Sequence, residues 1–146
     1  MPDKINFYRT SGEYGCFSNF SEHPVKIYGR VWKTSEHAFQ AQKFLDEKTQ
    51  IKIANCPTAS LAAKEGRKRT NKLRPDWEKI KDRIMREVVL AKFSQHEAAK
   101  TTLLGTDAKV LVEHTKNDAY WGDGGDGTGR NMLGRILMET RTKLRK

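Results

Sequence analysis

The sequence of 146 residues lacks the features that define several specialised protein classes. It has no apolar run near the ~20 residues of a membrane-spanning helix, and its first ten residues, MPDKINFYRT, contain no apolar signal core. Its two cysteines, Cys16 and Cys56, have no further cysteine or histidine at zinc-site spacing. We therefore expect no membrane association, no disulfide scaffold and no metal site, and a reducing cytoplasm suits this chain best.

Internal repeats, low-complexity tracts and Pro/Gly/Ser-rich linkers are also absent from the sequence. Apolar and aromatic residues are instead spread along the whole length, as in an ordinary folded domain. A chain of this size buries roughly 70% of its unfolded surface, which is enough for a core without covalent staples. We expect a single domain over residues 1–146.

Positive charge, by contrast, is abundant. The 28 Lys and Arg residues exceed the 18 Asp and Glu residues, which gives a net charge of +10. Much of this excess lies in residues 64–69 and 141–146. It favours polyanionic partners such as nucleic acid or nucleotide phosphates, although a solvated basic face explains such runs equally well.

Hydrophobic spacing predicts a mostly helical protein with a small β-sheet. Alternation predicts strands over 4–9 and 109–113, and a hairpin over 25–32 that turns near Tyr28 and Gly29, with Val25, Ile27 and Val31 alternating along it. Because strands do not alternate regularly with helices, we expect an α+β fold and not a doubly wound parallel sheet. Helices are expected over 34–45, 58–69, from 75 to about 91, over 96–104 and from 131 onward.

The helix expected over 34–45 carries the first candidate site. Glu36, Gln40 and Lys43 stand at i, i+4 and i+7, so a carboxylate, an amide and an ammonium share one helical face. A solvent-facing polar stripe is the alternative, and spacing alone favours it. His37 lies beside apolar positions, which favours a hydrogen-bonded core histidine over a catalytic one.

A second candidate is the loop over 12–21, GEYGCFSNFS. Its small polar groups lie between Phe17 and Phe20, and such a loop can stack a planar ring and hydrogen-bond the ring edges. The alternative is a turn that the two aromatic side chains anchor, and the sequence alone favours that alternative.

The third candidate is the segment 118–131, DAYWGDGGDGTGRN, which has five glycines in eight positions. Glycines allow the backbone to approach a ligand closely, and the helix after Asn131 begins with N–H groups that suit an anion. We expect the loop and the Asn131 amide to hold a phosphate, with a flexible structural loop as the alternative. The segment matches a dinucleotide fingerprint literally, but no βαβ unit surrounds it, and a calcium loop needs more oxygen ligands.

Together these segments resemble one family, the NADAR (NAD- and ADP-ribose-associated) superfamily, also called YbiA-like. The segment WKTSEHAFQAQKF resembles its Trp-x-Thr-x-Glu-His…Gln-Ala-x-Lys-Phe signature. FYR…GCFSNF resembles its opening motif, Trp77, Met85 and 91–93 its middle, and 111–141 its closing block. The resemblance covers nearly the whole chain and implies a YbiA-like α+β fold.

The resemblance also implies an enzyme, an N-glycosidase that acts on a phosphorylated riboside without a cofactor or metal. Some members of the family cleave phosphoribosylamino-pyrimidine intermediates of riboflavin synthesis, and others remove ADP-ribose from guanine in nucleic acid. Glu36 and Lys43 would be the reactive pair. Glu113 and Asp118 would hold the pocket residues in place without contacting the substrate. The substrate-binding residues would be Phe17, Ser18, Asn19, Trp121, Gly122, Asp126 and Asn131.

An N-ribosidic bond breaks through an oxocarbenium-like state, akin to that of glycoside hydrolysis. Glu36 could stabilise its positive charge, deliver a proton or orient water. Lys43 could pair with phosphate as an ammonium, or attack the anomeric carbon as a neutral amine and form a Schiff base, which requires a lowered pKa. The sequence leaves both roles open.

The basic composition favours ADP-ribosylated guanine in DNA or RNA over a riboflavin intermediate, because a metabolic glycosidase needs positive charge only in its pocket. An alternative of another class is a non-catalytic module that binds ADP-ribose or nucleic acid, which the net charge of +10 also fits.

Overall fold

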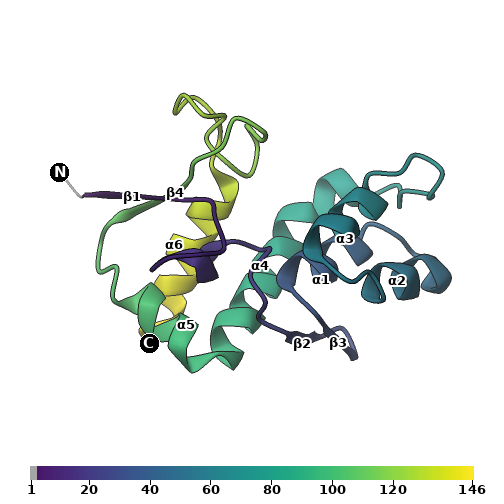
Figure 1. The fold of residues 1–146 in the computed structure, drawn as a ribbon, viewed down its shortest axis with the longest axis horizontal. Helices are drawn as coiled ribbons and strands as arrows, with labels where there is room; N and C mark the ends of the chain where they lie inside the picture. The colour runs from purple at the N-terminus through teal and green to yellow at the C-terminus, as the bar shows by residue number, and fades with distance from the viewer. Residues whose placement is uncertain (1–2) are drawn as a thin grey trace. The chain divides into compact units, whose positions relative to one another are not determined.

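The computed structural model describes residues 3–146, which form two compact units (Figure 1). The terminal unit contains the described residues up to Ser18 together with His96–Lys146, and the central unit is Asn19–Gln95. The elements of the central unit are β2 (Val25–Ile27), β3 (Arg30–Trp32), α1 (Ser35–Ala41), α2 (Glu47–Ala54), α3 (Ala59–Gly66) and α4 (Trp77–Gln95). The elements of the terminal unit are β1 (Lys4–Phe7), the 3-10 helix η1 (Gly15–Phe17), α5 (Glu97–Leu104), β4 (Val110–Glu113) and α6 (Met132–Leu144).

In the central unit, β2 and β3 form the predicted antiparallel hairpin, with Val25 opposite Trp32. Both turn residues have positive φ, 55° at Tyr28 and 74° at Gly29, as a two-residue primed hairpin turn requires. The expected inward alternation is wrong at Val31, which is 63% exposed. The pairing explains this, because Trp32 faces Val25 and is the buried residue of β3.

Helix α1 forms the centre of the central unit, where it packs against α2, α3, α4 and the hairpin. All seven of its residues are buried. The Thr34 side chain caps it by accepting a hydrogen bond from the His37 N–H at 3.2 Å. Thr58 caps α3 in the same way through the Leu61 N–H at 3.1 Å.

Three helix predictions in this unit differ from the structure. Helix α1 ends at Ala41 and not near residue 45, α3 ends at Gly66 and not near residue 69, and α2 was not predicted at all. After α1, the N–H groups of residues 42–44 bond to carbonyls three residues back, which tightens the chain into turns. The same early end leaves Leu45 68% exposed instead of in the core.

In the terminal unit, β1 and β4 pair in parallel, with Lys4 opposite Val110 and Phe7 opposite Glu113. Helix α6 packs against β4. A Cβ at Gly134 would overlap the carbonyl oxygen of Leu111, so this close contact of helix and strand requires glycine. The core face of α6 consists of Leu133, Ile136, Leu137 and Thr140, which are all buried, whereas Leu144 is half-buried.

The architecture is therefore the expected α+β class, mostly helical with a small sheet in two parts. Among residues 3–146, no helix combines the length and the apolar character needed to cross a bilayer.

Candidate active site

Glu36 lies in the first turn of α1 and is only 8% exposed. Its Oε2 accepts a hydrogen bond from Nε2 of Gln40 at 2.7 Å, one helical turn further on. Gln40 is 6% exposed, so the interpretation of a solvent-facing stripe is wrong for both side chains. The helix N-terminus and the amide donor both stabilise negative charge on the Glu36 carboxylate.

The other amide atom of Gln40, Oε1, is buried and has no hydrogen-bond partner within residues 3–146. It points at Gly66, where an added Cβ would overlap it. Such an acceptor is costly to bury without a partner, by about 1–3 kcal/mol. The Gln40 amide is therefore oriented by Glu36, and Gly66 provides the space that this orientation needs.

Lys43 follows α1 directly and is half-buried. Burial lowers the pKa of Lys43, the Glu36 carboxylate opposes that change, and the positive charges of Arg67 and Arg69 lower the pKa further. The Nζ atom lies 3.5 Å from the carbonyl oxygen of Gly66, at the long limit of a hydrogen bond. A lowered pKa increases the fraction of neutral, nucleophilic amine at a given pH.

Arg74 fixes the backbone around Lys43. Its N–H donates to the carbonyl of Lys43 at 2.8 Å, and its Nη1 donates to the carbonyl of Gln42 at 3.4 Å. The guanidinium is held in turn by Asp76, with Nε to Oδ1 at 2.7 Å and Nη2 to Oδ2 at 3.2 Å. The Arg74 guanidinium lowers the pKa of Asp76. Lys43 therefore lies on a turn that Arg74 holds in place, even though it is outside the helix.

His37 is the hydrogen-bonded core histidine that the sequence favoured. It is fully buried, with Nδ1 at 2.7 Å from Thr34 Oγ1 and Nε2 at 2.9 Å from the carbonyl oxygen of Cys56. A carbonyl can only accept, so Nε2 carries the proton and Nδ1 accepts from the threonine hydroxyl. Burial lowers the pKa of His37, which agrees with a neutral imidazole.

Asn19 supports the N-terminus of α1 from the adjoining loop. It is 7% exposed, its Oδ1 accepts from Ser35 Oγ at 3.0 Å, and its Nδ2 donates to the sulfur of Met85 at 3.4 Å. Its backbone carbonyl accepts the Glu36 N–H at 3.0 Å. The structure thus connects Asn19 directly to the backbone of the proposed catalytic carboxylate.

Phe17 and Ser18 belong to the terminal unit and are both buried. The Phe17 ring meets Phe7 edge-on at 5.7 Å and stacks on Tyr14 at 5.4 Å with an interplanar angle of 27°. This agrees with an aromatic anchor at Phe17, whereas Phe20, the other expected anchor, is 40% exposed. The role of Phe17 in stacking a substrate stays a prediction.

The glycine-rich loop closes on itself through its backbone. The N–H groups at the start of α6 and just before it point at carbonyls of residues 119–122, at distances of 2.8–3.0 Å. The Asn131 N–H donates to the carbonyl of Gly122 in this structure, and the expected contact of the Asn131 amide with a phosphate stays a prediction. The donor and acceptor pairs are Arg130 to Ala119, Asn131 to Gly122, Met132 to Tyr120 and Leu133 to Trp121.

Asn131 occupies the N-cap position of α6 in a left-handed conformation with φ 52°, but its side chain does not cap the helix. Its Oδ1 accepts from the Glu113 N–H and its Nδ2 donates to the Leu111 carbonyl, both at 2.9 Å. The Asn131 side chain therefore forms the backbone hydrogen bonds with β4 that a neighbouring strand would form, and it links the end of the loop to that strand.

Asp118 organises the aromatic part of the loop. Its Oδ1 accepts from the N–H groups of Tyr120 at 2.9 Å and Trp121 at 2.8 Å, so it fixes the backbone of Trp121, a predicted substrate-binding residue. The Trp121 ring lies edge-on to Tyr120 at 4.8 Å, and the Arg130 guanidinium lies 5.0 Å from the Tyr120 ring centre.

Gly122 and Asp126 differ in how closely they are held. A Cβ at Gly122 would come within 2.9 Å of the carbonyl oxygens of Glu113 and Asp118, so only glycine fits. Asp126 is exposed, and its Oδ1 accepts from the N–H and hydroxyl of Thr128 at 3.0 and 2.6 Å. These hydrogen bonds from Thr128 lower the pKa of Asp126.

The sequence did not reveal the contact of His114 with Asp123. Asp123 is 5% exposed, and its Oδ2 lies 2.7 Å from His114 Nδ1. Its Oδ1 accepts from the N–H groups of Thr115 at 3.1 Å and Gly125 at 2.8 Å. The His114 hydrogen bond is the main cause that lowers the pKa of Asp123. No periodic pattern joins residues nine positions apart across a loop, so only tertiary structure brings this pair together.

The predicted site residues thus form two groups. Asn19, Glu36 and Lys43 are joined around α1 in the central unit. The second group lies between β4 and α6 in the terminal unit and contains Glu113, Asp118, Trp121, Gly122 and Asn131.

Within residues 3–146, no group of three or more His, Cys, Asp or Glu side chains is placed to hold a metal ion.

Comparison with known proteins gives consistent matches. The family model of the NADAR domain matches residues 6–145. The chain is 54% identical over 140 residues to the N-glycosidase YbiA of Escherichia coli, which covers 96% of this chain and 88% of that protein. The NMR structure of E. coli YbiA matches with a TM-score of 0.91 at 53% identity, covering 99% of this chain and 87% of that one. This likeness confirms the α+β fold.

Two further relatives are more distant. An N-glycosidase of Nostoc punctiforme is 43% identical over 144 residues, which covers 97% of this chain and 92% of that protein. A riboflavin biosynthesis protein of Vibrio vulnificus is 40% identical over 146 residues, which covers all of this chain but only 40% of that longer protein.

Proposed function

Because this chain belongs to the NADAR family and is a hydrolase of N-glycosyl bonds, we propose that it removes ADP-ribose from guanine bases in nucleic acid. One observation carries the proposal. A buried carboxylate, Glu36, lies within electrostatic range of a half-buried amine, Lys43, whose pKa is lowered. A carboxylate and a neutral amine are the two groups that an N-ribosidase with a covalent intermediate needs.

Glu36 acts as the carboxylate. It stabilises the positive charge that develops on the ribose as the bond to the base breaks, and it then orients the water that completes hydrolysis. The Gln40 donor at 2.7 Å supports this role, because an N–H favours the negatively charged form of the group. Gln40 is a positioning residue, since it acts on the substrate only through Glu36.

Lys43 acts as the nucleophile. The lone pair of Nζ forms a bond to the anomeric carbon, and the bond from that carbon to the base nitrogen breaks with its electron pair leaving on the base, which takes up a proton. Loss of a proton from Nζ and opening of the ribose ring give a Schiff base. One water then adds to this imine and releases the sugar and the free amine.

The surroundings of Lys43 support a polyanionic substrate. The basic run at the end of α3 contributes four exposed side chains, and two of them, Arg67 and Arg69, lower the pKa of Lys43 by their charge. The positive charge is therefore concentrated beside the proposed nucleophile, where phosphates that flank the target base could be held. The four residues are Lys64, Arg67, Lys68 and Arg69.

A product assay tests the proposal. The protein is incubated with DNA that carries ADP-ribosylated guanine and, separately, with phosphoribosylamino-pyrimidine, and the released sugar is measured. We expect turnover of the DNA, and we expect Glu36→Gln to abolish it, with a loss of at least about 10²–10⁴-fold typical of acid–base groups. Glu47→Gln, at an exposed glutamate in α2, is the matched control.

Three outcomes separate the alternatives. Wild-type rates in Glu36→Gln, with an unchanged circular dichroism spectrum, would refute the assigned role. Binding of the modified DNA without release of ADP-ribose would indicate a non-catalytic module. Turnover of the pyrimidine alone would favour the riboflavin intermediate, a substrate class that the 40% identity to the Vibrio vulnificus riboflavin biosynthesis protein supports.

A further inference from the structure

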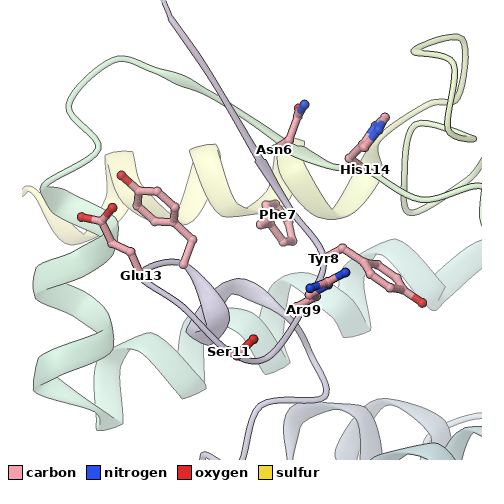
Figure 2. A pocket seen from close by; sticks show the side chains of 8 residues that line it. Asn6, Phe7, Tyr8, Arg9, Ser11, Glu13 and His114 are labelled. Atoms are coloured by element: carbon pink, nitrogen blue, oxygen red, sulfur yellow. The ribbon is translucent and has the colours of Figure 1, made fainter.

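A cavity of about 420 Å³ lies in the terminal unit and contains neither Glu36 nor Lys43, which belong to the central unit (Figure 2). The parallel pairing creates it, because β1 and β4 end together and His114 donates its N–H to the carbonyl of Phe7 at 2.9 Å. The loop after β1 forms the remaining wall. The lining residues are Asn6, Phe7, Tyr8, Arg9, Ser11, Glu13, Tyr14 and His114.

One part of this cavity suits an anion. Arg9 is exposed, and its guanidinium forms no ion pair among the described residues. The His114 side chain is 50% exposed, and its Nδ1 is bonded to the buried Asp123 carboxylate. That carboxylate can only accept, so Nδ1 carries the proton and Nε2 of the neutral ring is an acceptor, which suits a ribose hydroxyl and not a phosphate. Arg9 therefore supplies the contact for an anion. Figure 2 shows both side chains at the cavity.

The other part suits a planar ring. Tyr14 is half-buried and is held by its stacking on Phe17 at 5.4 Å, while Tyr8, which also lines the cavity, is 50% exposed. Burial and then the charge of Glu13, together with a hydrogen bond to it, raise the pKa of Tyr14. The Glu13 carboxylate is thus oriented at the ring, with lone pairs that can accept N–H groups.

We propose that this cavity binds a purine nucleotide, with its phosphate at Arg9, a ribose hydroxyl donated to Nε2 of His114, its base against Tyr8 and Tyr14, and base N–H groups donated to Glu13. A cavity of about 420 Å³ lies in the range of small-ligand pockets. Guanine fits this arrangement better than adenine, because its Watson–Crick edge offers two adjacent N–H donors to one carboxylate. The occupant is either a free nucleotide or one unit of a nucleic acid strand.

Amide NMR spectra of the ¹⁵N-labelled protein, titrated with GMP, test this site. We expect shifts at the amides of residues 6–14 and 114, and binding of ribose 5-phosphate at least about tenfold weaker because it lacks the stacking ring. Arg9→Ala should weaken GMP binding about tenfold, as the loss of a charge-assisted hydrogen bond does. Glu13→Gln should reduce the preference for GMP over AMP.

Lys143→Ala removes one exposed positive charge from α6, outside the cavity, and should leave GMP binding unchanged. A short single-stranded oligonucleotide that contains guanine distinguishes the two sources of the ligand. Tighter binding than GMP at the same amides identifies a nucleotide within a strand, and equal or weaker binding identifies a free nucleotide.

The proposal is overturned if GMP leaves these amides unshifted, if ribose 5-phosphate binds as tightly as GMP, or if Arg9→Ala and Lys143→Ala behave alike. Its failure is separate from a failure of the proposed glycosidase role. The Glu36→Gln protein should still show the GMP shifts at residues 6–14, whether or not its turnover is lost.

Discussion

Helix α1 and the glycine-rich loop hold the candidate site by different means. On α1, side chains hold other side chains, as the Gln40 amide holds the Glu36 carboxylate at 2.7 Å. In the loop, the backbone holds itself, through hydrogen bonds from residues 130–133 to carbonyls of residues 119–122. Substitutions on the polar side of α1 should therefore affect chemistry more than stability, and substitutions in the loop should do the reverse.

The largest effect is expected at Lys43 in the first region. Lys43→Arg keeps a positive charge but cannot serve as a neutral nucleophile, so turnover should fall at least about 10²-fold while binding of the modified DNA persists. In the wild type, the lowered pKa of Lys43 means that kcat rises with pH as the amine loses its proton, at a lower pH than for an ordinary lysine.

Single-turnover rates across a pH series measure both effects. Lys48→Arg, at an exposed lysine of α2, is the control and should keep the wild-type profile. Full activity in Lys43→Arg with a flat pH profile would instead assign Lys43 to phosphate pairing.

The next effect is expected in the loop. A Cβ at Gly129 would lie 2.5 Å from the carbonyl carbon of Asp123 and 2.6 Å from the oxygen of Gly122, both backbone atoms that side-chain rotation cannot move. Gly129→Ala should therefore lower the free energy of unfolding by about 3 kcal/mol, at the upper end for overpacking. Urea denaturation measures it.

Gly127→Ala is the matched control, because nothing lies within 4 Å of its Cβ position and only its φ of 85° opposes a side chain. We expect a cost of about 1–2 kcal/mol for that variant. Equal losses at both positions would show that the loop is not closed as tightly as its hydrogen bonds indicate.

The third largest effect is expected for Asp123→Asn, which should change how the free energy of unfolding depends on pH in the acidic range. The pKa of Asp123 is lowered in the folded state, so the unfolded chain binds a proton more readily. The resulting stabilisation is complete at a pH well above ~3.9, the ordinary pKa of aspartate. It is lost as the pH falls through the lower pKa that Asp123 has in the folded protein. The variant should lose about 1–3 kcal/mol at pH 7.

The same variant should show a shallower decline in stability below about pH 5, because one linked carboxylate is missing. Asp107→Asn, at an exposed aspartate of the terminal unit, should keep the wild-type slope. Urea titrations at pH 7 and at pH 3 compare the three proteins, and parallel declines would contradict the assigned role of Asp123.

The smallest effect is expected for Gln40→Leu. It removes the donor that holds Glu36, so kcat should fall about tenfold, the usual scale for one hydrogen bond to a charged group. Stability should change little, because the buried Oε1 that lacks a partner is removed as well. Gln42→Leu, two residues further along, is the control and should keep both properties. A large loss of stability in Gln40→Leu with unchanged kcat would reverse the contrast between the two regions.

The sequence predicted features that depend on local spacing. The shared face of Glu36 and Gln40 and the hairpin turn near Tyr28 and Gly29 both follow from residues within four positions of one another. It did not predict where α1 ends, because Arg74, far along the chain, binds the carbonyls of residues 42 and 43.

The loop was harder to predict for the same reason. The role of Asn131 depends on β4, and the burial of Asp123 depends on His114 and two backbone N–H groups. Composition indicated a loop with close backbone contacts, but the partners of its N–H groups are a property of the tertiary fold. The predicted binding role of the loop residues therefore stays a prediction, although their scaffold role is clear.

The Asn131 side chain also has a consequence for the behaviour of the protein at high concentration. The N–H groups of Val110 and His114 point to β1, so those of Leu111 and Glu113 lie on the opposite edge of β4, where another chain could add a strand. Asn131 occupies the Glu113 N–H and the Leu111 carbonyl on that edge. The Asp123 N–H donates to the Glu113 carbonyl on the same edge at 2.8 Å. Asn131 and Asp123 together thereby occupy backbone groups at which copies of the protein could otherwise pair.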